Sequence, residues 1–219
     1  MTNDVLNSPN GKNTHANDIN MNGQIVGYFD SGNGNFHACR WVDGVMTDLG
    51  FSGAAYRIND SGDIVGKYGF ASSYTAFLYR NNHITNLGTL GGGFSEAQDI
   101  NNLGQIVGWS YISGTSDSRA FIYQSGHMVD LNSLVDPGLG WIFYRATAIN
   151  NSGQIVGYGN LGAFMLTPIP EPTALWTLAY ATATLMMFKL SRRCKSRTDK
   201  MSEISPVESP LSDPLGVPG

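Results

Sequence analysis

The chain has 219 residues, a net charge of −4 and 42% hydrophobic residues, which suits one ordinary domain or one domain with appendages. Only 14% of the residues are charged, and the 27 glycines indicate a turn-rich chain, so the composition favours an all-β fold. The negative charge excludes a generally basic nucleic-acid-binding protein, and two cysteines exclude a disulfide scaffold. Residues 1–172 carry a net −6 and residues 173–219 a net +2, so the chain has two physically different parts.

A twelve-residue pattern, A-x-x-I-N-x-x-G-x-I-V-G, occurs four times in the first part. Its copies begin at Ala16, Ala55, Ala97 and Ala146. In each copy an Asn opens and a Gly closes a four-residue turn, and the Ile-Val pair that follows suits a buried strand. A second pattern, an alanine-led strand and a hairpin turn such as Asp43-Gly44, follows in the first three copies. Each repeat is therefore expected to form four short strands.

The period of about 40 residues is typical of a propeller blade. We expect an all-β, propeller-like array of four-stranded repeats over residues 1–167. The fourth copy stops before its last strand, whereas residues 1–7 resemble the strand that precedes Ala97. Two arrangements stay open: a closed four-bladed ring that residues 1–7 complete, and a fragment of a larger propeller.

The second pattern resembles the HAF repeat of bacterial surface proteins, which is named for a His-Ala-Phe triplet. Its first copy reads His37-Ala38-Cys39, and the later copies keep the Ala-Phe pair without the histidine. These pairs are Ala76-Phe77, Ala120-Phe121 and Ala163-Phe164. The resemblance covers about residues 16–167. It implies a secreted or surface-exposed repeat protein and no particular chemistry.

The second part of the chain has three pieces. Residues 168–172 form a proline-rich linker that breaks regular structure. Residues 173–190 predict a transmembrane helix, because 18 nearly uncharged residues reach about 27 Å as a helix. Residues 191–219 hold a basic cluster and a Ser/Pro-rich tail that we expect to be disordered. The positive-inside rule then places the C-terminus in the cytoplasm and the repeats outside, with the lipid bilayer as a partner.

This order of Pro-Glu-Pro, apolar span and basic residues resembles the PEP-CTERM sorting signal of Gram-negative bacteria. The residues that carry the resemblance are Pro170, Glu171, Pro172, Arg192 and Arg193. It implies export, recognition by an exosortase and removal of the tail at the cell surface. The family normally begins with a secretory signal peptide, and residues 1–12 lack an apolar stretch of that kind. A start further upstream and a protein that is not exported therefore both stay open.

The sequence predicts no catalytic residue, cofactor or metal site, because the histidines fall in turns and no metal-ligand spacing occurs. Trp109, Trp141 and Tyr144 are expected in loops, where they are the candidate contacts for an extracellular polysaccharide. The leading hypothesis is a non-catalytic structural or ligand-binding repeat protein of the cell envelope. The alternatives are an extracellular propeller that binds or processes glycans, and a cytosolic domain with a C-terminal tail anchor.

Overall fold

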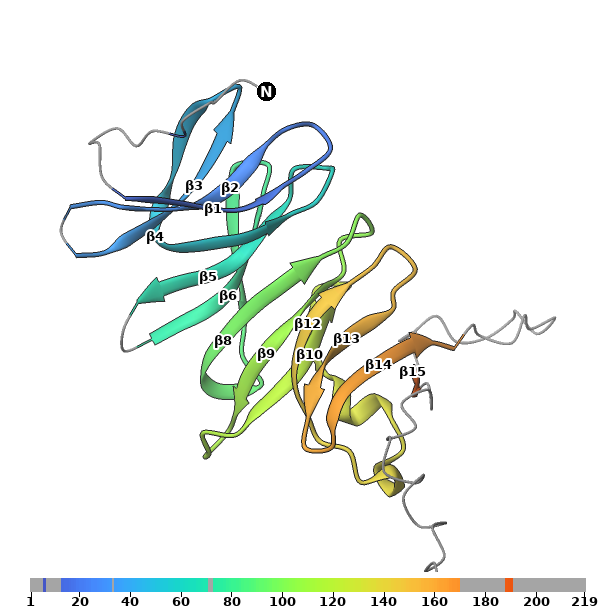
Figure 1. Ribbon diagram of the computed structural model, residues 1–219. Coiled ribbons are helices and arrows are strands. Elements are labelled where there is room, and N and C mark those ends of the chain that lie inside the picture. The colour runs from blue at the N-terminus through green and yellow to red at the C-terminus, as the bar shows by residue number, and fades with distance from the viewer. Residues whose placement is uncertain (1–5, 7–12, 33, 71–72, 170–187, 191–219) are drawn as a thin grey trace, which may run out of the picture.

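The computed structural model describes residue 6 and residues 13–32, 34–70, 73–169 and 188–190. These residues form four antiparallel four-stranded sheets, stacked one after another in chain order (Figure 1). One parallel residue pair, Tyr74 and Phe94, joins the second sheet to the third. The prediction of an all-β array of four-stranded repeats is confirmed at this level. The open stack is not a closed ring, because the first and last sheets lie at its opposite ends.

The first two sheets share one long strand. Sheet 1 contains β1, β2, β3 and the first part of β4, and sheet 2 contains the rest of β4 followed by β5, β6 and β7. The bounds are Thr14–Ile19 for β1, Ile25–Asp30 for β2, Phe36–Val42 for β3, Val45–Ile58 for β4, Ile64–Phe70 for β5, Ser73–Arg80 for β6 and His83–Gly88 for β7.

Sheets 3 and 4 repeat this arrangement without a shared strand. Sheet 3 contains β8 to β11 and sheet 4 contains β12 to β15, with the short 3-10 helices η1 and η2 between them. The bounds are Gly91–Ile100 for β8, Ile106–Ile112 for β9, Ser118–Gln124 for β10, His127–Asp130 for β11, Leu131–Leu134 for η1, Pro137–Leu139 for η2, Phe143–Ile149 for β12, Ile155–Gly159 for β13, Gly162–Pro168 for β14 and Phe188–Leu190 for β15.

The last glycine of each twelve-residue pattern has a role that the sequence did not reveal. The first strand of every sheet carries a bulge two residues before the pattern's isoleucine, as between Ala97 and Asp99. At Gly108 the bulged strand approaches so closely that a Cβ atom would collide with the carbonyl oxygen of Glu96. The same collision would occur at Gly27, Gly66 and Gly157. These glycines therefore permit close strand contact, in addition to the turn glycines that the sequence predicted.

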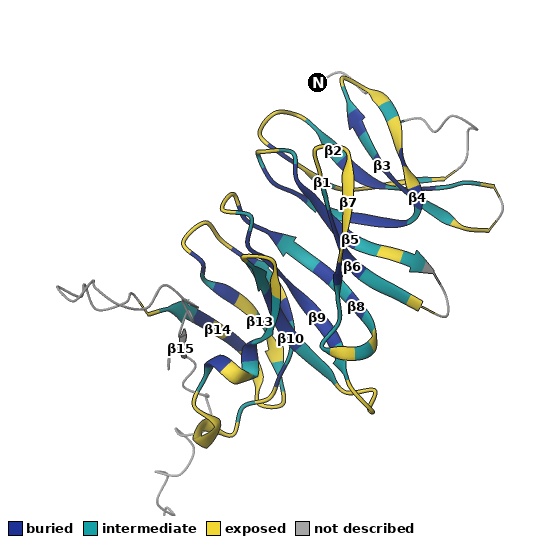
Figure 2. Ribbon diagram, turned by 180° about the vertical axis from the view of Figure 1, so that it is seen from behind, coloured by how far each residue is buried: buried dark blue, intermediate teal, exposed yellow. Residues whose placement is uncertain are grey.

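The core consists of three seams between consecutive sheets. We call the face of a sheet that packs on the preceding sheet its front face, and the opposite face its rear face. In the seam between sheets 2 and 3, the rear face supplies Val65, Ala76 and Leu78, and the front face supplies Ile100 and Phe121. Equivalent residues form the other two seams. Figure 2 shows buried residues on the stacked strands and exposed ones at their turns.

Both ends of the described chain differ from what the sequence suggested. Leu6 packs against Phe29, Cys39 and Trp41 of the first sheet, so it does not complete the fourth sheet and close a ring. The fourth strand of that sheet is β15, whose Phe188 pairs with Pro168. Residues 188–190 are therefore a strand, where the sequence predicted the end of a transmembrane helix. Residues 173–187 of that predicted span lie outside the described residues.

Among the residues that the structure describes, no helix is long and apolar enough to cross a membrane.

Candidate functional site

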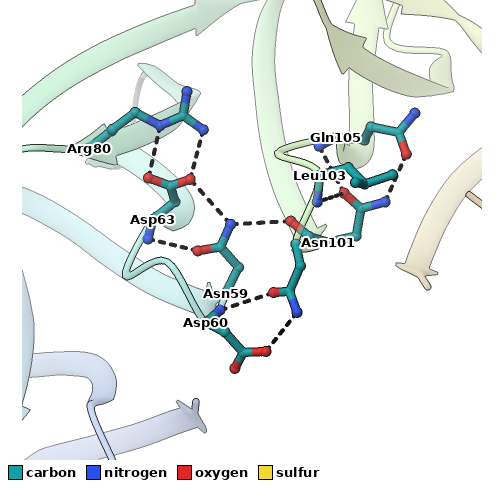
Figure 3. Close-up of polar contacts among 8 residues, drawn as sticks. Asn59, Asp60, Asp63, Arg80, Asn101, Leu103 and Gln105 are labelled. Atoms are coloured by element: carbon teal, nitrogen blue, oxygen red, sulfur yellow. Dashed lines mark hydrogen bonds and ion pairs between the residues drawn. The ribbon is translucent and has the colours of Figure 1, made fainter. Parts of the chain in front are cut away.

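A ladder of asparagine side chains runs from sheet to sheet along the turn that opens each repeat. Asn20 Nδ2 donates to the backbone carbonyl oxygen of Asn59 (3.0 Å), and Asn59 Nδ2 donates to that of Asn101 (3.2 Å, Figure 3). Asn101 Nδ2 donates in turn to that of Asn150 (3.0 Å). Asn20, Asn59 and Asn101 are buried, so each hydrogen bond lies where water competes weakly. The ladder therefore joins all four repeats.

Each rung also caps its own turn, as the sequence predicted. The Asn101 Oδ1 atom accepts from the backbone N–H groups of Leu103 and Gln105, both at 3.0 Å. The Asn101 Nδ2 atom donates to the side-chain oxygen of Gln105 at 2.7 Å as well as to the next sheet. One asparagine side chain thus satisfies a turn and a seam together, through an acceptor oxygen and a separate NH2 group with two donors, a combination that neither Asp nor Ser carries.

A second row of contacts runs beside the ladder. The backbone N–H of Met21 donates to Asp60 Oδ1, that of Asp60 to Asn102 Oδ1, and that of Asn102 to Asn151 Oδ1, at 2.8–3.0 Å. The hydrogen bonds from Met21 and Asn102 lower the pKa of the Asp60 carboxyl. Asp60 therefore stays ionised as an acceptor between two sheets.

The buried carboxylate of Asp63 replaces the glutamine that the other repeats carry after the turn glycine. Arg80 Nε and Nη2 donate to its two oxygens at 2.8 and 2.7 Å (Figure 3). In sheet 3 the equivalent residues are Gln105 and Gln124, which are joined by a neutral hydrogen bond of 3.0 Å. An ion pair in sheet 2 and an amide pair in sheet 3 therefore make the same connection, from the end of the turn to the third strand of the sheet.

The richest polar cluster lies around Glu96 and draws residues from three sheets. Lys67 Nζ lies 3.6 Å from Glu96 Oε1, and Trp109 Nε1 donates to Glu96 Oε2 at 3.2 Å. The Lys67 ammonium lies over the Tyr74 ring (4.9 Å to the centroid), and the Arg145 guanidinium lies over the Trp109 ring (4.2 Å). Both geometries suit cation–π attraction. We call these five residues the Glu96 cluster.

The electrostatics of the Glu96 cluster favour neutral phenols and paired charges. Burial raises the pKa of Tyr74, and the nearby Glu96 carboxylate raises it further. Burial and Glu96, in that order, also raise the pKa of Tyr56 above its ordinary value. Both cations of the cluster lie over aromatic rings, and Lys67 also lies beside the Glu96 carboxylate, so these contacts connect sheets 2, 3 and 4.

The structure separates the three aromatic residues that the sequence proposed as ligand contacts. Trp109 lies in β9, not in a loop, and is only 2% exposed, so its ring faces are covered. Trp141 is half-buried and stacks on Phe143 beside the third seam (5.6 Å between centroids). Tyr144 is half-buried in β12. The expected loop position is wrong for Trp109 and Tyr144, and Trp141 alone keeps a position outside the strands.

The sorting-signal residues Pro170, Glu171, Pro172, Arg192 and Arg193 lie outside the described residues. Within the described part of the chain, no three His, Cys, Asp or Glu side chains come together as a metal site would require. Cys39 is a buried free thiol; burial, with a smaller effect of Asp48, raises its pKa to about 12.

Sequence reasoning identified the ladder asparagines as turn residues and missed their contacts between repeats. The signal that points to a second role is strict identity, because Asp or Ser would also suit the first turn position, yet all four copies have Asn. A scan against protein-family models and searches of curated proteins and solved structures find no match to this chain.

Proposed function

We propose that this chain is a non-catalytic repeat protein of the cell envelope, with a structural or ligand-binding role and an open, propeller-like array of sheets. The single observation that carries the structural role is the asparagine ladder, which extends through every repeat. The other recurring polar contacts, such as that from Asp60 to Asn102, also connect one sheet to the next. The residues that recur in this chain therefore build a scaffold.

The proposed cellular location of this scaffold rests on the C-terminal sequence. Pro170-Glu171-Pro172, the apolar residues 173–187 and the pair Arg192-Arg193 together support export, sorting by an exosortase-type enzyme and membrane anchoring or release. The bilayer and this sorting enzyme are the proposed partners, and residues 198–219 are a proposed disordered tail.

Fractionation of the native cells tests the proposed cellular location. We expect the full chain in the envelope fraction or, after processing, at the cell surface, and external protease should degrade the repeats on intact cells. Recovery solely as soluble cytosolic protein contradicts the proposal. An envelope-bound chain whose repeats resist external protease supports the alternative of a cytosolic domain with a C-terminal tail anchor. A cytosolic marker protein, which must stay intact in the same sample, controls for cell lysis.

Glycan binding is the second candidate, and partly exposed aromatic rings favour it. Trp141 is half-buried, and Tyr144 follows it three residues later. We expect a glycan array probed with the full chain to show a signal that falls in Trp141→Ala and Tyr144→Ala. Tyr68→Ala, which removes an exposed ring elsewhere, is the matched control. Unchanged binding in the first two variants removes this candidate, and Trp109 is unsuitable because its loss disturbs the core.

A further inference from the structure

The front face of sheet 1 exposes residues that are buried at every internal seam. Ile19 is 61% exposed, whereas the equivalent isoleucines of the later repeats are 6–7% exposed. These are Ile58, Ile100 and Ile149. Ala16 is likewise exposed, although its equivalents Ala55, Ala97 and Ala146 are buried. Sheet 1 thus presents part of a seam for which the described residues supply no preceding sheet.

The rear face of sheet 4 is exposed in the complementary way. Val156 is 40% exposed, whereas the equivalent valines are fully buried against the next sheet; they are Val26, Val65 and Val107. Ala163 and Met165 are also exposed, although Ala120 and Ile122 at the same positions of sheet 3 are fully buried. An exposed apolar face of this kind marks an interaction surface.

The polar ladder ends at the same two faces. In the internal steps an asparagine amide donates to the carbonyl oxygen of the next asparagine, as Asn101 does to Asn150. The Asn150 amide donates to the side chain of its own Gln154, and among the described residues no carbonyl of a following sheet lies beyond it. At the other end, the Asn20 carbonyl oxygen accepts the turn N–H of Gly23, as the other ladder carbonyls do in their own turns. The carbonyl oxygens of Asn59, Asn101 and Asn150 accept, in addition, a hydrogen bond from the side-chain amide of the preceding ladder asparagine.

Leu6 adds an independent observation. In the internal seams a leucine that ends or directly follows the preceding sheet packs on the front face of the next one; these leucines are Leu49, Leu87 and Leu131. Leu6 packs in the same way on the front face of sheet 1, against Cys39 and Trp41. The front face of sheet 1 therefore binds a leucine from outside the sheet, as the front faces at the internal seams do.

We propose that a second copy of this chain covers these faces, with the rear face of sheet 4 in one copy packed on the front face of sheet 1 in the next. Ile19 then lies against Val156 and Ala163 of its neighbour, and the Asn150 amide donates to the neighbour's Asn20 carbonyl oxygen. The argument is continuity, because this contact reproduces a seam that the chain builds three times internally. Such a heterologous contact gives a ring or a filament of copies.

One hydrogen bond of an internal seam has no acceptor in the proposed contact between copies, and restoring that acceptor gives a further test. In the second row of contacts, a backbone N–H donates to the side-chain oxygen of Asp60, Asn102 or Asn151 in the next sheet. The equivalent residue of sheet 1 is Met21, which offers no oxygen to the backbone N–H of a neighbouring Asn151. Met21→Asn supplies that acceptor and is expected to tighten the association.

Sedimentation velocity of the full chain over a range of concentrations tests the proposal. One detergent is used throughout because of the apolar residues 173–190. The wild type is expected to form species larger than a monomer that grow with concentration. Ile19→Glu and Val156→Glu, each disabling one face, are expected to weaken association by roughly thirtyfold or more. Val45→Glu is the matched control, since Val45 is an exposed hairpin residue on neither face.

Mixing the two disabled variants tests whether the front face of one copy binds the rear face of another. Each keeps one intact face, so an equal mixture of Ile19→Glu and Val156→Glu must form dimers and nothing larger. Circular dichroism confirms that both variants stay folded, as their surface positions predict. The proposal is overturned if the wild type is monomeric, if the mixture stays monomeric, or if either variant associates alone as strongly as Val45→Glu. A Met21→Asn variant that associates no more tightly than the wild type contradicts the proposed ladder contact.

Discussion

The asparagine ladder can be measured by comparing Asn101→Ala with Asn150→Ala. The two side chains make the same three contacts within their turns: Oδ1 accepts two backbone N–H groups, and Nδ2 donates to a glutamine. They differ in two respects. Asn101 is buried and donates to the next sheet, whereas Asn150 is exposed and ends the ladder. The difference between the two variants therefore isolates the seam contact and its burial.

The expected magnitude follows from these contacts. A net intramolecular hydrogen bond contributes about 1 kcal/mol, and a buried polar group left without a partner costs about 1–3 kcal/mol. Asn150→Ala exposes its turn groups to water, so we expect a loss of about 1 kcal/mol. Asn101→Ala also removes the cross-sheet bond and the oxygen that accepts the N–H of the buried Gln105. We expect its loss of unfolding free energy to be larger by about 1–3 kcal/mol.

Urea unfolding of the full chain, followed by tryptophan fluorescence, measures both losses, and equal m-values are required for the comparison. Asn101→Asp serves as a third variant, because it keeps the turn-capping oxygen but places a second carboxylate oxygen against the acceptor oxygens of Gln105 and Asn150 in a buried site. We expect its loss to be at least as large as that of Asn101→Ala. If Asn101→Ala and Asn150→Ala lose the same free energy within experimental error, the ladder does not stabilise the seam and our reasoning is refuted.

Three further predictions concern single sites. Gly108→Ala forces a Cβ atom against the facing carbonyl and is expected to cost about 1–3 kcal/mol in urea unfolding; Gly93→Ala, with open space around it, is the control, and equal costs would exclude the close-contact explanation. Although burial raises the pKa of Asp63, hydrogen bonds from Arg80 and Asn59 lower it more, to below the ordinary pKa of an Asp carboxyl. Its contribution to stability is therefore complete above that ordinary pKa and is lost as the pH falls through the lowered pKa. Asp63→Asn should consequently show a smaller fall of the urea midpoint between pH 5 and pH 2, and an identical fall would contradict the assignment. The Cys39 thiol, with a pKa of about 12, should resist thiol reagents at pH 8 in a Cys194→Ser chain until urea is added, and rapid labelling of the folded chain would show that the sheet 1 core is open.

The repeats and their strands could be predicted because their signals are local. Each copy of Asn-x-x-Gly predicts a turn by itself, because its residue types favour the backbone conformations of a turn. The structure contains these turns, with Gly104 at φ +77°. Isoleucine and valine after each turn are buried as expected, among them Ile106 and Val107. Local turn chemistry and β-propensity therefore sufficed for the order of the strands as far as β14, but not for β15, where the sequence predicted a helix.

The contacts between sheets could not be predicted in the same way. The position of Trp109 illustrates why: the sequence suggested a loop, but Trp109 continues β9, and Arg145 of the next sheet lies over its ring. The Glu96 cluster likewise combines residues from three repeats, which no spacing along the chain brings together. The stacking of the sheets decides these contacts, and stacking is a long-range property.

The shared strand β4 has a mechanical consequence. Because Val45–Ile58 belongs to sheets 1 and 2 at once, tension along the chain passes from one sheet to the next without any slack. Between sheets 3 and 4, in contrast, residues 131–142 hold only two 3-10 turns and extend to about 40 Å when pulled straight. Because Leu131 and Leu134 of this connection are buried in the third seam, it can extend only after they leave the core, whereas sheets 1 and 2 share a strand and have no such connection to extend.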